Sequence, residues 1–399
     1  MDAALSNLVA LGDTQLLRVE TRYVRPTRKE LLPESRLQLV IGPRGVGKTT
    51  LLLQHGKLER EARKYAYLSL DDLYFATHDL LEVLGELNAD GVAVALLDEV
   101  HLYPNWSRTL KNAYDRYPRL KIIATGSAAL KIYEGEADLS RRADLVYMPT
   151  LSFREYLYFV TGQLLPIVTW GELEWTHQEL AVAVSNVMNT PLAAWRDYLS
   201  HGAYPGNITE PKRAHGRLRE VADQVLRRDI PAIEDYRPQT TKALRRLLAL
   251  IAENAPFKPN VSKLAGQVET SRTTLYKLIE HLDNARLVRA IPAAGKGDAV
   301  LNKPDKLYLG DPNLMSAFAA VPDMGTLRET FFATTWPEGT RMTTSKTGDF
   351  NVEGDTFEVN GRNKGFDQIK DDPRGFLAVD GIEVGHGHRI PLYLFGLLR

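Results

Sequence analysis

The chain has 399 residues, of which 44% are hydrophobic and 25% are charged, and this length predicts two or three globular domains with cores of their own. Fifty basic residues balance fifty acidic ones, so any surface that binds nucleic acid must be a local one. The chain has no cysteine, which excludes disulfides and thiolate metal sites and favours a reducing compartment.

The start of the chain and its longest apolar runs bear on where the protein resides. Residues 1–5 carry neither the basic leader nor the long apolar core of a secretory signal. The longest apolar runs, such as residues 92–97, are far shorter than the roughly 20 residues of a membrane-spanning helix. We therefore expect a cytoplasmic protein without a membrane partner.

The first part of the chain predicts a helical lead-in followed by a parallel sheet. Residues 1–35 form the lead-in, whose basic side chains, among them Arg25 and Arg28, we interpret as a solvated face. Residues 36–151 alternate short apolar segments with helical ones, which is typical of a parallel sheet covered on both faces. The strands are expected at residues 37–41, 64–70, 92–98, 120–125 and 146–151.

A glycine-rich segment follows the first of these strands directly. Its spacing, glycine followed after four residues by Gly-Lys-Thr, is that of a phosphate-binding loop, in which backbone N–H groups and a helix N-terminus surround a polyphosphate. Lys48 is expected to reach the β- and γ-phosphates, and the Thr49 hydroxyl to bind Mg²⁺. The nucleotide-binding residues predicted here are Gly42, Pro43, Arg44, Gly45, Val46, Gly47, Lys48, Thr49 and Thr50.

Two carboxylates and two hydroxyls follow later strands of the same sheet. The apolar strand at residues 92–98 ends in Asp98 and Glu99, of which Asp98 is predicted to hold Mg²⁺ and Glu99 to polarise the attacking water. Thr125 and Ser127 end the next strand, and either hydroxyl could sense the γ-phosphate. The alternative is a Thr/Ser turn that opens the next helix.

Arg141 and Arg142 are candidates for a cation that stabilises the transition state of phosphoryl transfer. Such an arginine acts either in cis or from a neighbouring copy of the chain, and the second case requires a homo-oligomer. The alternative for both residues is a surface position or an ion pair.

Five segments together resemble a known family. They occupy residues 42–50, 67–72, 97–101, 103–106 and 124–127, and read GPRGVGKTT, YLSLDD, LDEVH, YPNW and ATGS. They are similar to the archaeal and bacterial AAA-type ATPases of the extended AAA+ superfamily, and the resemblance runs over nearly the whole chain. It implies ATP hydrolysis, and it implies a C-terminal domain of uncharacterised function with a restriction-endonuclease-like fold.

Two short motifs point to other classes of nucleotide enzyme. Asp98 opens the sequence DEVH, the motif of a large helicase class, but such helicases need a second recombinase-like domain that we do not find. Residues 302–305 spell NKPD, the guanine-reading motif of GTPases, but they lie two hundred residues after Asp98. In addition, GTPases have a glycine three residues after the corresponding aspartate, and this chain has none there. We therefore expect ATP, with Mg²⁺, as the cofactor.

Residues 152–237 predict a helical lid, and residues 238–292 predict a winged helix-turn-helix. In the second of these, an apolar stripe at helical spacing leaves polar residues on the outer side. Such a helix would enter the major groove of double-stranded DNA, and the alternative is a module that contacts protein. The phosphate contacts are expected from Lys263, Arg272 and Lys277, and the contacts nearest to base edges from Thr273 or Tyr276.

Residues 293–399 predict a small α/β domain of the restriction-endonuclease-like kind. In such enzymes an Asp begins one strand and a Glu-x-Lys lies on the next, which Asp349 and Glu358 match, and Glu329 could add a third acid to a second metal site. Asn360 occupies the lysine position, although Arg362 or Lys364 could supply the charge, and Gln368 is where such folds often keep a glutamine. We therefore expect a degenerate domain that binds or scaffolds.

The function that we expect is Mg²⁺-dependent ATP hydrolysis, with the nucleotide state coupled to engagement of DNA or a protein partner by the two distal domains. One alternative is an ATP-binding switch or scaffold with little turnover. Another is a structure-directed nuclease powered by ATP.

Overall fold

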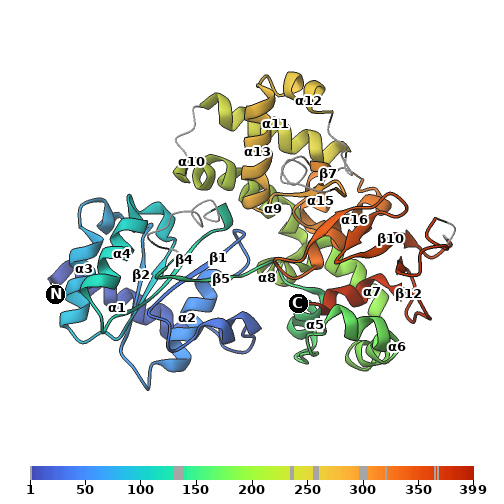
Figure 1. Ribbon diagram of the computed structural model, residues 1–399. Helices are drawn as coiled ribbons and strands as arrows, with labels where there is room; N and C mark the ends of the chain where they lie inside the picture. Colours follow the sequence, from blue (N-terminus) through green and yellow to red (C-terminus); the bar gives the residue numbers. More distant parts are fainter. Residues whose placement is uncertain are drawn as a thin grey trace. The chain divides into compact units, whose positions relative to one another are not determined.

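The computed structural model describes residues 2–129, 139, 141–233, 238–254, 260–295, 304–319, 321–363, 365 and 368–399. Asn302, Lys303 and Lys364, which the sequence singled out, lie outside these residues. The chain forms two compact units (Figure 1). Unit 1 consists of Met1–Pro149 and Arg228–Asp235, and unit 2 consists of Thr150–Arg227 and Tyr236–Arg399.

Unit 1 is built on a parallel sheet of five strands in the order β2-β3-β4-β1-β5. The sheet confirms the predicted α/β class. The strands are β1 (Leu37–Gly42), β2 (Tyr65–Ser69), β3 (Val94–Asp98), β4 (Lys121–Ser127) and β5 (Asp144–Tyr147). The last of them lies earlier in the chain than the predicted 146–151, because Met148 donates the final backbone bond, to Ile41, and Pro149 has no N–H to continue the pairing.

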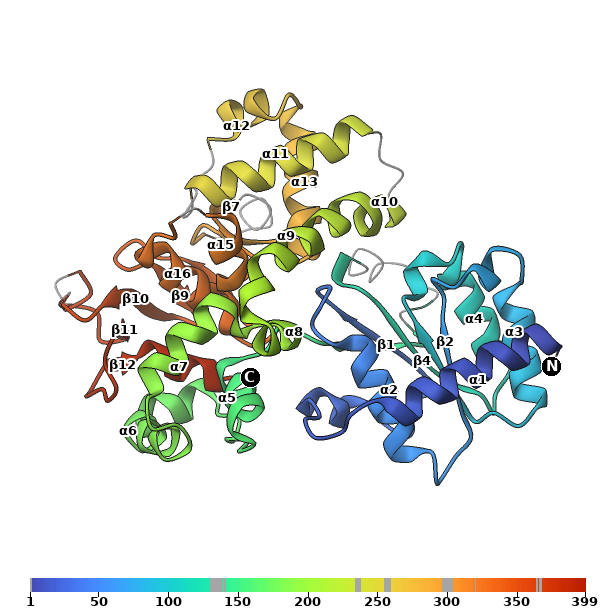
Figure 2. The ribbon, with the colours of Figure 1, turned by 180° about the vertical axis from the view of Figure 1, so that it is seen from behind.

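Helices cover both faces of this sheet (Figure 2). Helices α1 and α2 lie on one face and α3 and α4 on the other, and α1 packs against β2 and α2. Gly12 of α1 allows this packing, because a Cβ there would lie 2.3 Å from the carbonyl oxygen of Tyr67. The helices are α1 (Ala3–Arg18), α2 (Lys48–Glu59), α3 (Leu80–Ala89) and α4 (Trp106–Arg116), with short 3₁₀ turns at η1 (Pro26–Glu30), η2 (Leu73–Ala76) and η3 (Val100–Leu102).

Unit 2 begins with a helical segment that packs on the C-terminal sheet. The indole of Trp170 donates to Asp355 at 2.8 Å, and that of Trp195 donates to Asp380 at 3.0 Å. Most of the residues predicted as a helical lid, those before Arg228, therefore share a unit with the end of the chain. Their helices are α5 (Phe153–Thr161), α6 (Trp170–Val187), α7 (Pro191–Asp197), α8 (Pro205–Thr209) and α9 (Ala214–Gln224), with a π turn, η5 (Tyr198–Gly202), and a 3₁₀ turn, η6 (Pro211–Arg213).

The next part of unit 2 contains helices, two of them joined by a short turn, followed by a two-stranded antiparallel sheet. The apolar stripe of the second helix is buried as expected, and Ser271 caps this helix by accepting from the backbone N–H of Thr274. The preceding helix begins at Val261, because the Asn260 side chain caps it by accepting from the backbone N–H of Lys263. The elements are α11 (Pro238–Asn254), α12 (Val261–Gln267), α13 (Arg272–Asn284), and the antiparallel strands β6 (Val288–Pro292) and β7 (Pro304–Leu309).

The chain ends in a mixed sheet of five strands in the order β12-β11-β10-β9-β8. Along the chain, the first three strands of this sheet pair antiparallel and the last two add in parallel. The hairpin between β9 and β10 turns at Glu353 and Gly354, whose φ angles are 51° and 96°. Aromatic rings in edge-to-face and tilted contacts, including those of Trp170, Phe332 and Phe357, pack beneath it. The elements are α15 (Pro312–Phe318), α16 (Met324–Thr335), β8 (Met342–Thr344), β9 (Phe350–Val352), β10 (Asp355–Gly361), β11 (Gly375–Asp380), β12 (Arg389–Pro391) and η8 (Leu392–Leu397).

A search for membrane-crossing helices found no candidate in the part of the chain that the structure describes, since every helix there is too short or too polar.

Candidate functional site

The glycine-rich loop joins the end of β1 to the start of α2, as the sequence predicted. Gly45 and Gly47 have φ angles of 87° and 97°, in the left-handed region that favours glycine. A side chain at Gly42 would lie 2.1 Å from the carbonyl oxygen of Met148, so the strand end also requires glycine. The first turn of α2 leaves backbone N–H groups without partners inside the helix, and these groups favour an anion.

Lys48 folds back onto this loop. Its ammonium group donates to the carbonyl oxygens of Gly42 and Pro43, both at 2.9 Å, and the residue is 6% exposed. Burial lowers the pKa of Lys48, whereas the charge of Glu99 raises it. The ammonium is therefore held at the loop by bonds that phosphate oxygens can replace.

Asp98, the last residue of β3, accepts hydrogen bonds from three hydroxyls, which come from β2, β4 and the first turn of α2. Thr49 donates to it at 2.7 Å and Tyr67 at 3.0 Å, and Thr125 donates to its other oxygen. Burial, together with the Asp98 charge, raises the pKa of Tyr67, which therefore stays a donor. The Thr49 hydroxyl and the Asp98 carboxylate are oxygen ligands of the kind that Mg²⁺ prefers.

Glu99 is held in an unusual backbone conformation beside Asp98. Its φ angle of 55° lies in the left-handed region, which is strained for a residue with a side chain. Its backbone N–H donates to the Thr125 hydroxyl at 3.0 Å, so the fully buried Thr125 joins the two acids. The side chain of Glu99 is 23% exposed and reaches the solvent. Thr125, which we predicted as a phosphate sensor, thus contacts both carboxylate residues directly.

A third carboxylate, that of Asp229, lies at the same loop although it is far from Asp98 and Glu99 in the sequence. Its Oδ1 is 3.2 Å from the Arg44 guanidinium and 3.7 Å from His101 Nε2, and Ser127 hydrogen-bonds to it. Burial raises the pKa of Asp229, but the His101 ring and the Arg44 charge outweigh this effect and lower it to about 2. No local motif marks Asp229, so sequence reasoning missed it.

Arg25 is a further residue that the sequence analysis misjudged. The interpretation of a solvated face is wrong for it, because it is 5% exposed and donates to Val46 in the loop at 3.2 Å and to Pro149 at 2.7 Å. Arg28 is also engaged, in an ion pair with Glu59. A run of basic residues does not reveal which of them has carbonyl acceptors nearby.

Replacing Arg25 by methionine is expected to lower the free energy of unfolding by about 2–3 kcal/mol, because the buried carbonyls lose a charged donor while the apolar stem remains. Urea unfolding of the intact chain measures this loss. Arg22→Met, at an exposed position of the same lead-in, is the control and should change stability by less than about 0.5 kcal/mol. Equal losses for the two variants would contradict the assignment.

The structure places the predicted arginine pair beside α4. Arg142 makes two hydrogen bonds to Asp115, at 3.0 and 3.2 Å, and Arg141 is exposed. Arg142 is therefore engaged in an ion pair, which is the alternative that the sequence left open, while a role of Arg141 in catalysis stays a prediction.

The residues predicted to contact DNA lie at the surface of unit 2. Lys263 on α12 is exposed, as are Arg272, Thr273 and Lys277 on α13, and Tyr276 is half-buried between them. Their contacts with DNA stay a prediction.

The acids of the predicted second metal site are only partly brought together. Lys306 of β7 has its ammonium 3.2 Å from Glu329 and 3.5 Å from Asp349, and Tyr308 donates to Glu329 at 2.6 Å. Burial, with the Asp349 charge, raises the pKa of Glu329. The third acid, Glu358, is buried and accepts from Asn360 at 3.3 Å. Within the described residues, no group of three or more His, Cys, Asp or Glu side chains is arranged to hold a metal ion.

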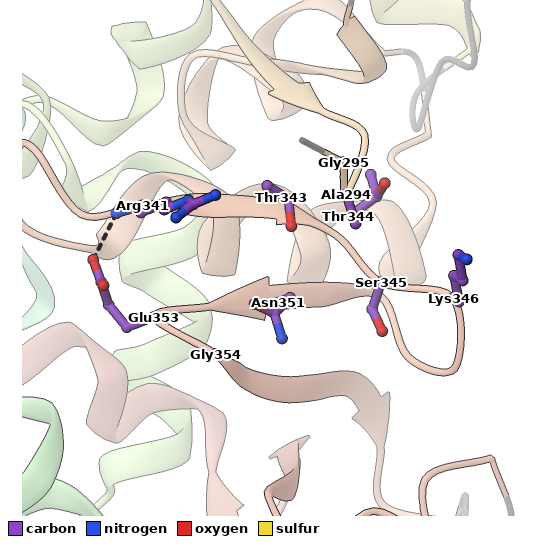
Figure 3. Close-up of a pocket in the computed structure, with 10 residues that line it drawn as sticks. All are labelled: Ala294, Gly295, Arg341, Thr343, Thr344, Ser345, Lys346, Asn351, Glu353 and Gly354. Carbon is purple, nitrogen blue, oxygen red and sulfur yellow. Dashed lines mark hydrogen bonds between the residues drawn. The ribbon is translucent and has the colours of Figure 1, made fainter. Parts of the chain in front are cut away.

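Unit 2 also has a hollow of about 530 Å³ beside β8 and β9 (Figure 3). Arg341, Thr343, Lys346 and Asn351 are among its lining residues, and Glu353 accepts a hydrogen bond from the backbone of Arg341 at 2.8 Å. The hollow lies at the edge of the sheet, and Lys306 with its acids does not line it.

The parallel sheet, the glycine-rich loop between β1 and α2, and the carboxylates at the end of β3 together define a phosphate-loop nucleotide-binding fold. Residues 34–157 match a family model described as an AAA domain, which supports nucleotide binding and ATPase activity in unit 1. Residues 192–324 match a second model, described as a domain of unknown function, DUF8612. That match leaves the restriction-endonuclease-like fold unconfirmed.

A curated relative is an uncharacterized protein of Methanocaldococcus jannaschii, which is 27% identical over 302 residues. The match covers 72% of this chain and 62% of the relative, so it spans less than two thirds of that protein.

Three solved structures are similar over parts of the chain. C. elegans PCH-2 is 18% identical with a TM-score of 0.26, covering 40% of this chain and 44% of that one. A structure of katanin self-assembly is 16% identical with a TM-score of 0.26, covering 48% and 71%. The Aeropyrum pernix ORC1 protein in complex with DNA is 12% identical with a TM-score of 0.31, covering 76% and 90%. TM-scores this low do not establish a common overall fold.

Proposed function

We propose that unit 1 binds ATP with Mg²⁺ and hydrolyses it. The observation that carries this proposal is the 2.7 Å hydrogen bond between Thr49 and Asp98, which joins the phosphate loop to the acid at the end of β3. These two oxygens fit Mg²⁺, which in phosphate-loop sites takes few protein ligands and completes its shell with phosphate oxygens and water. The match to the AAA domain supports the same assignment.

The side chains at the loop then have separate tasks. Lys48 exchanges the carbonyls of Gly42 and Pro43 for phosphate oxygens, which compensates its buried charge. Glu99 orients the attacking water and accepts its proton. When bound, Mg²⁺ neutralises the charge that develops on the phosphoryl oxygens. Thr125 keeps Asp98 and Glu99 in fixed positions, so that little rearrangement is needed when the nucleotide arrives.

We further propose that the nucleotide state controls how α12 and α13 engage double-stranded DNA or a protein partner. The exposed basic residues Arg272 and Lys277 support the DNA case. Leu275 and Leu278 of the same helix are buried, so the two basic side chains lie on its solvent-exposed side. Because the chain as a whole carries no net charge, a contact with DNA must be confined to a local basic surface. For the C-terminal sheet, the ammonium of Lys306 beside Glu329 and Asp349 supports a domain that binds or scaffolds over one that cleaves.

The DNA contact is tested by the double variant Arg272→Ala/Lys277→Ala. We expect weaker binding to duplex DNA and a plot of log affinity against log salt whose slope falls by about 1.8, because each lost phosphate contact removes about 0.9. Fluorescence anisotropy at several salt concentrations measures both quantities. Lys212→Ala, at another exposed basic position of unit 2, is the control. An unchanged slope would leave a protein partner, or a second copy of the chain, as the ligand of this surface.

A further inference from the structure

The segment that carries Asp229 has a special place in the chain. Residues 228–233, which we call the Asp229 segment, belong to the stretch Arg228–Asp235 of unit 1, whereas the chain before and after that stretch belongs to unit 2. The segment starts in a π turn, η7 (Val225–Asp229), and continues as α10 (Ile230–Ile233). Pro231 explains the irregular turn, because its ring excludes the carbonyl of Arg227 four residues earlier and it has no N–H to donate.

The Asp229 carboxylate is buried among groups of the nucleotide site. The side chain is 1% exposed, and its Oδ1 lies 3.2 Å from the guanidinium of Arg44, a residue of the phosphate loop itself. Ser127 at the end of β4 hydrogen-bonds to it. His101 lies between the two acids, with Nε2 3.7 Å from Asp229 and 3.5 Å from Glu99. Asp229 thus contacts a loop cation, Arg44, that also lies 4.0 Å from the proposed catalytic acid, Glu99.

These partners are donors suited to a terminal phosphate. A guanidinium and a hydroxyl bind a phosphate oxygen as readily as a carboxylate oxygen, because both are anionic acceptors. Arg44 is also only 4.0 Å from Glu99, and Asp229 is the second charge, after Glu99, that raises the pKa of the buried Lys48. A triphosphate brings several negative charges to the groups that already hold Asp229, and like charges in a buried site repel.

We propose that the Asp229 carboxylate takes the place of the terminal phosphate in the nucleotide-free protein, and that ATP displaces it from Arg44 and Ser127 and so releases the Asp229 segment. The proposal rests on ATP binding at the phosphate loop, as proposed above, and gives that site its regulation. Because the chain continues from the segment into unit 2 on both sides, its release is a physical step by which the nucleotide state reaches the rest of the chain.

Displacement of Asp229 by ATP determines in which direction the ATP affinity changes when the Asp229 contact is removed. A contact that ATP must break weakens ATP binding, so removing the contact strengthens binding, and coupling between the two events is reciprocal. ADP has no γ-phosphate to compete with Asp229, so its affinity is insensitive to the contact. A residue that merely positions Arg44 for the nucleotide has the opposite effect, because its removal weakens ATP binding.

The test is Asp229→Asn in the intact chain, with affinities for ADP and a non-hydrolysable ATP analogue measured by calorimetry with Mg²⁺. We expect the analogue to bind about 10-fold tighter than to the wild type and ADP to change less than about 2-fold. Glu61→Gln is the matched control, since it removes the charge of an exposed carboxylate of the same unit and leaves both affinities unchanged. Unchanged or weaker analogue binding by Asp229→Asn overturns the proposal.

Hydrogen exchange of the wild type provides a measurement that does not depend on the variant folding. Amides of residues 225–233 are expected to exchange faster with the ATP analogue than with ADP or without nucleotide. Equal exchange in the three states overturns the release of the segment. If the analogue binds with no such difference, only this inference fails, whereas if neither nucleotide binds the wild type, the proposed function fails with it.

Discussion

Replacing Glu99 by glutamine is expected to lower ATP turnover by about 100- to 10,000-fold while the protein still binds ATP, because the amide cannot accept a proton from the attacking water. Glutamine keeps the size of the side chain and the backbone N–H that donates to Thr125, so the strained conformation at residue 99 is retained. The backbone N–H groups of the loop and the Lys48 ammonium, which are the proposed phosphate donors, are also unchanged.

Single-turnover hydrolysis and equilibrium binding of ATP, measured on the same preparation, separate chemistry from affinity in the Glu99→Gln variant. Glu61→Gln removes an exposed carboxylate of the same unit and serves as the control, with wild-type turnover expected. Wild-type turnover in Glu99→Gln would mean that another group activates the water. A wild type that binds ATP but turns it over no faster than the variant would favour the switch with little turnover.

Replacing Lys48 by alanine is expected to weaken ATP binding by about 100-fold or more and to abolish turnover. The Lys48 ammonium is a buried cation of the loop. A charge-assisted hydrogen bond to phosphate contributes about 1.5–3 kcal/mol, and the electrostatic attraction between the buried ammonium and the phosphates adds to this binding free energy. The variant also leaves the carbonyls of Gly42 and Pro43 without their donor.

Calorimetric titration with ATP and Mg²⁺ measures the effect of Lys48→Ala, and urea unfolding of the same variant shows whether the loop remains folded. Lys29→Ala, at an exposed lysine of the lead-in, is the control. ATP binding of wild-type strength in Lys48→Ala would place the nucleotide elsewhere in the molecule.

Local sequence patterns predicted those parts of the nucleotide site whose chemistry depends on residues that are neighbours in the sequence. The loop from Gly42 to Thr49 was predicted together with its strand and helix, because glycines with positive φ and the start of a helix leave a direct pattern in the sequence. Asp98 was placed correctly at the end of a buried strand for the same reason. In unit 2, the stripe that contains Leu275 and Leu278 predicted the buried face of α13.

Contacts between distant parts of the chain were not predictable in this way. The position of Thr125 at a strand end was evident, but its bonds to Asp98 and Glu99 depend on how two strands pair. Asp229 reaches the loop from a segment that carries no motif, and only the folded chain brings it to Arg44. The ammonium of Lys306 beside Glu329 likewise joins a strand and a helix that no sequence pattern connects.

The division of the chain into two units was not predictable for the same reason, because it depends on contacts between distant parts of the chain. The predicted boundaries separated a helical segment at residues 152–237 from the C-terminal domain, whereas the structure groups most of that segment with the C-terminal sheet. The bonds from Trp170 to Asp355 and from Trp195 to Asp380 join residues far apart in the chain, so helical periodicity alone does not report them.

The most direct test of the account is ATP turnover by the wild type, measured with Mg²⁺ and with EDTA, beside Lys48→Ala and Glu99→Gln purified in the same way. We expect phosphate release that requires Mg²⁺, that Lys48→Ala abolishes because the loop cation is removed, and that Glu99→Gln lowers by about 100-fold or more because the base is removed. Phosphate release that persists with EDTA, or that is equal in all three proteins, would contradict hydrolysis at this loop.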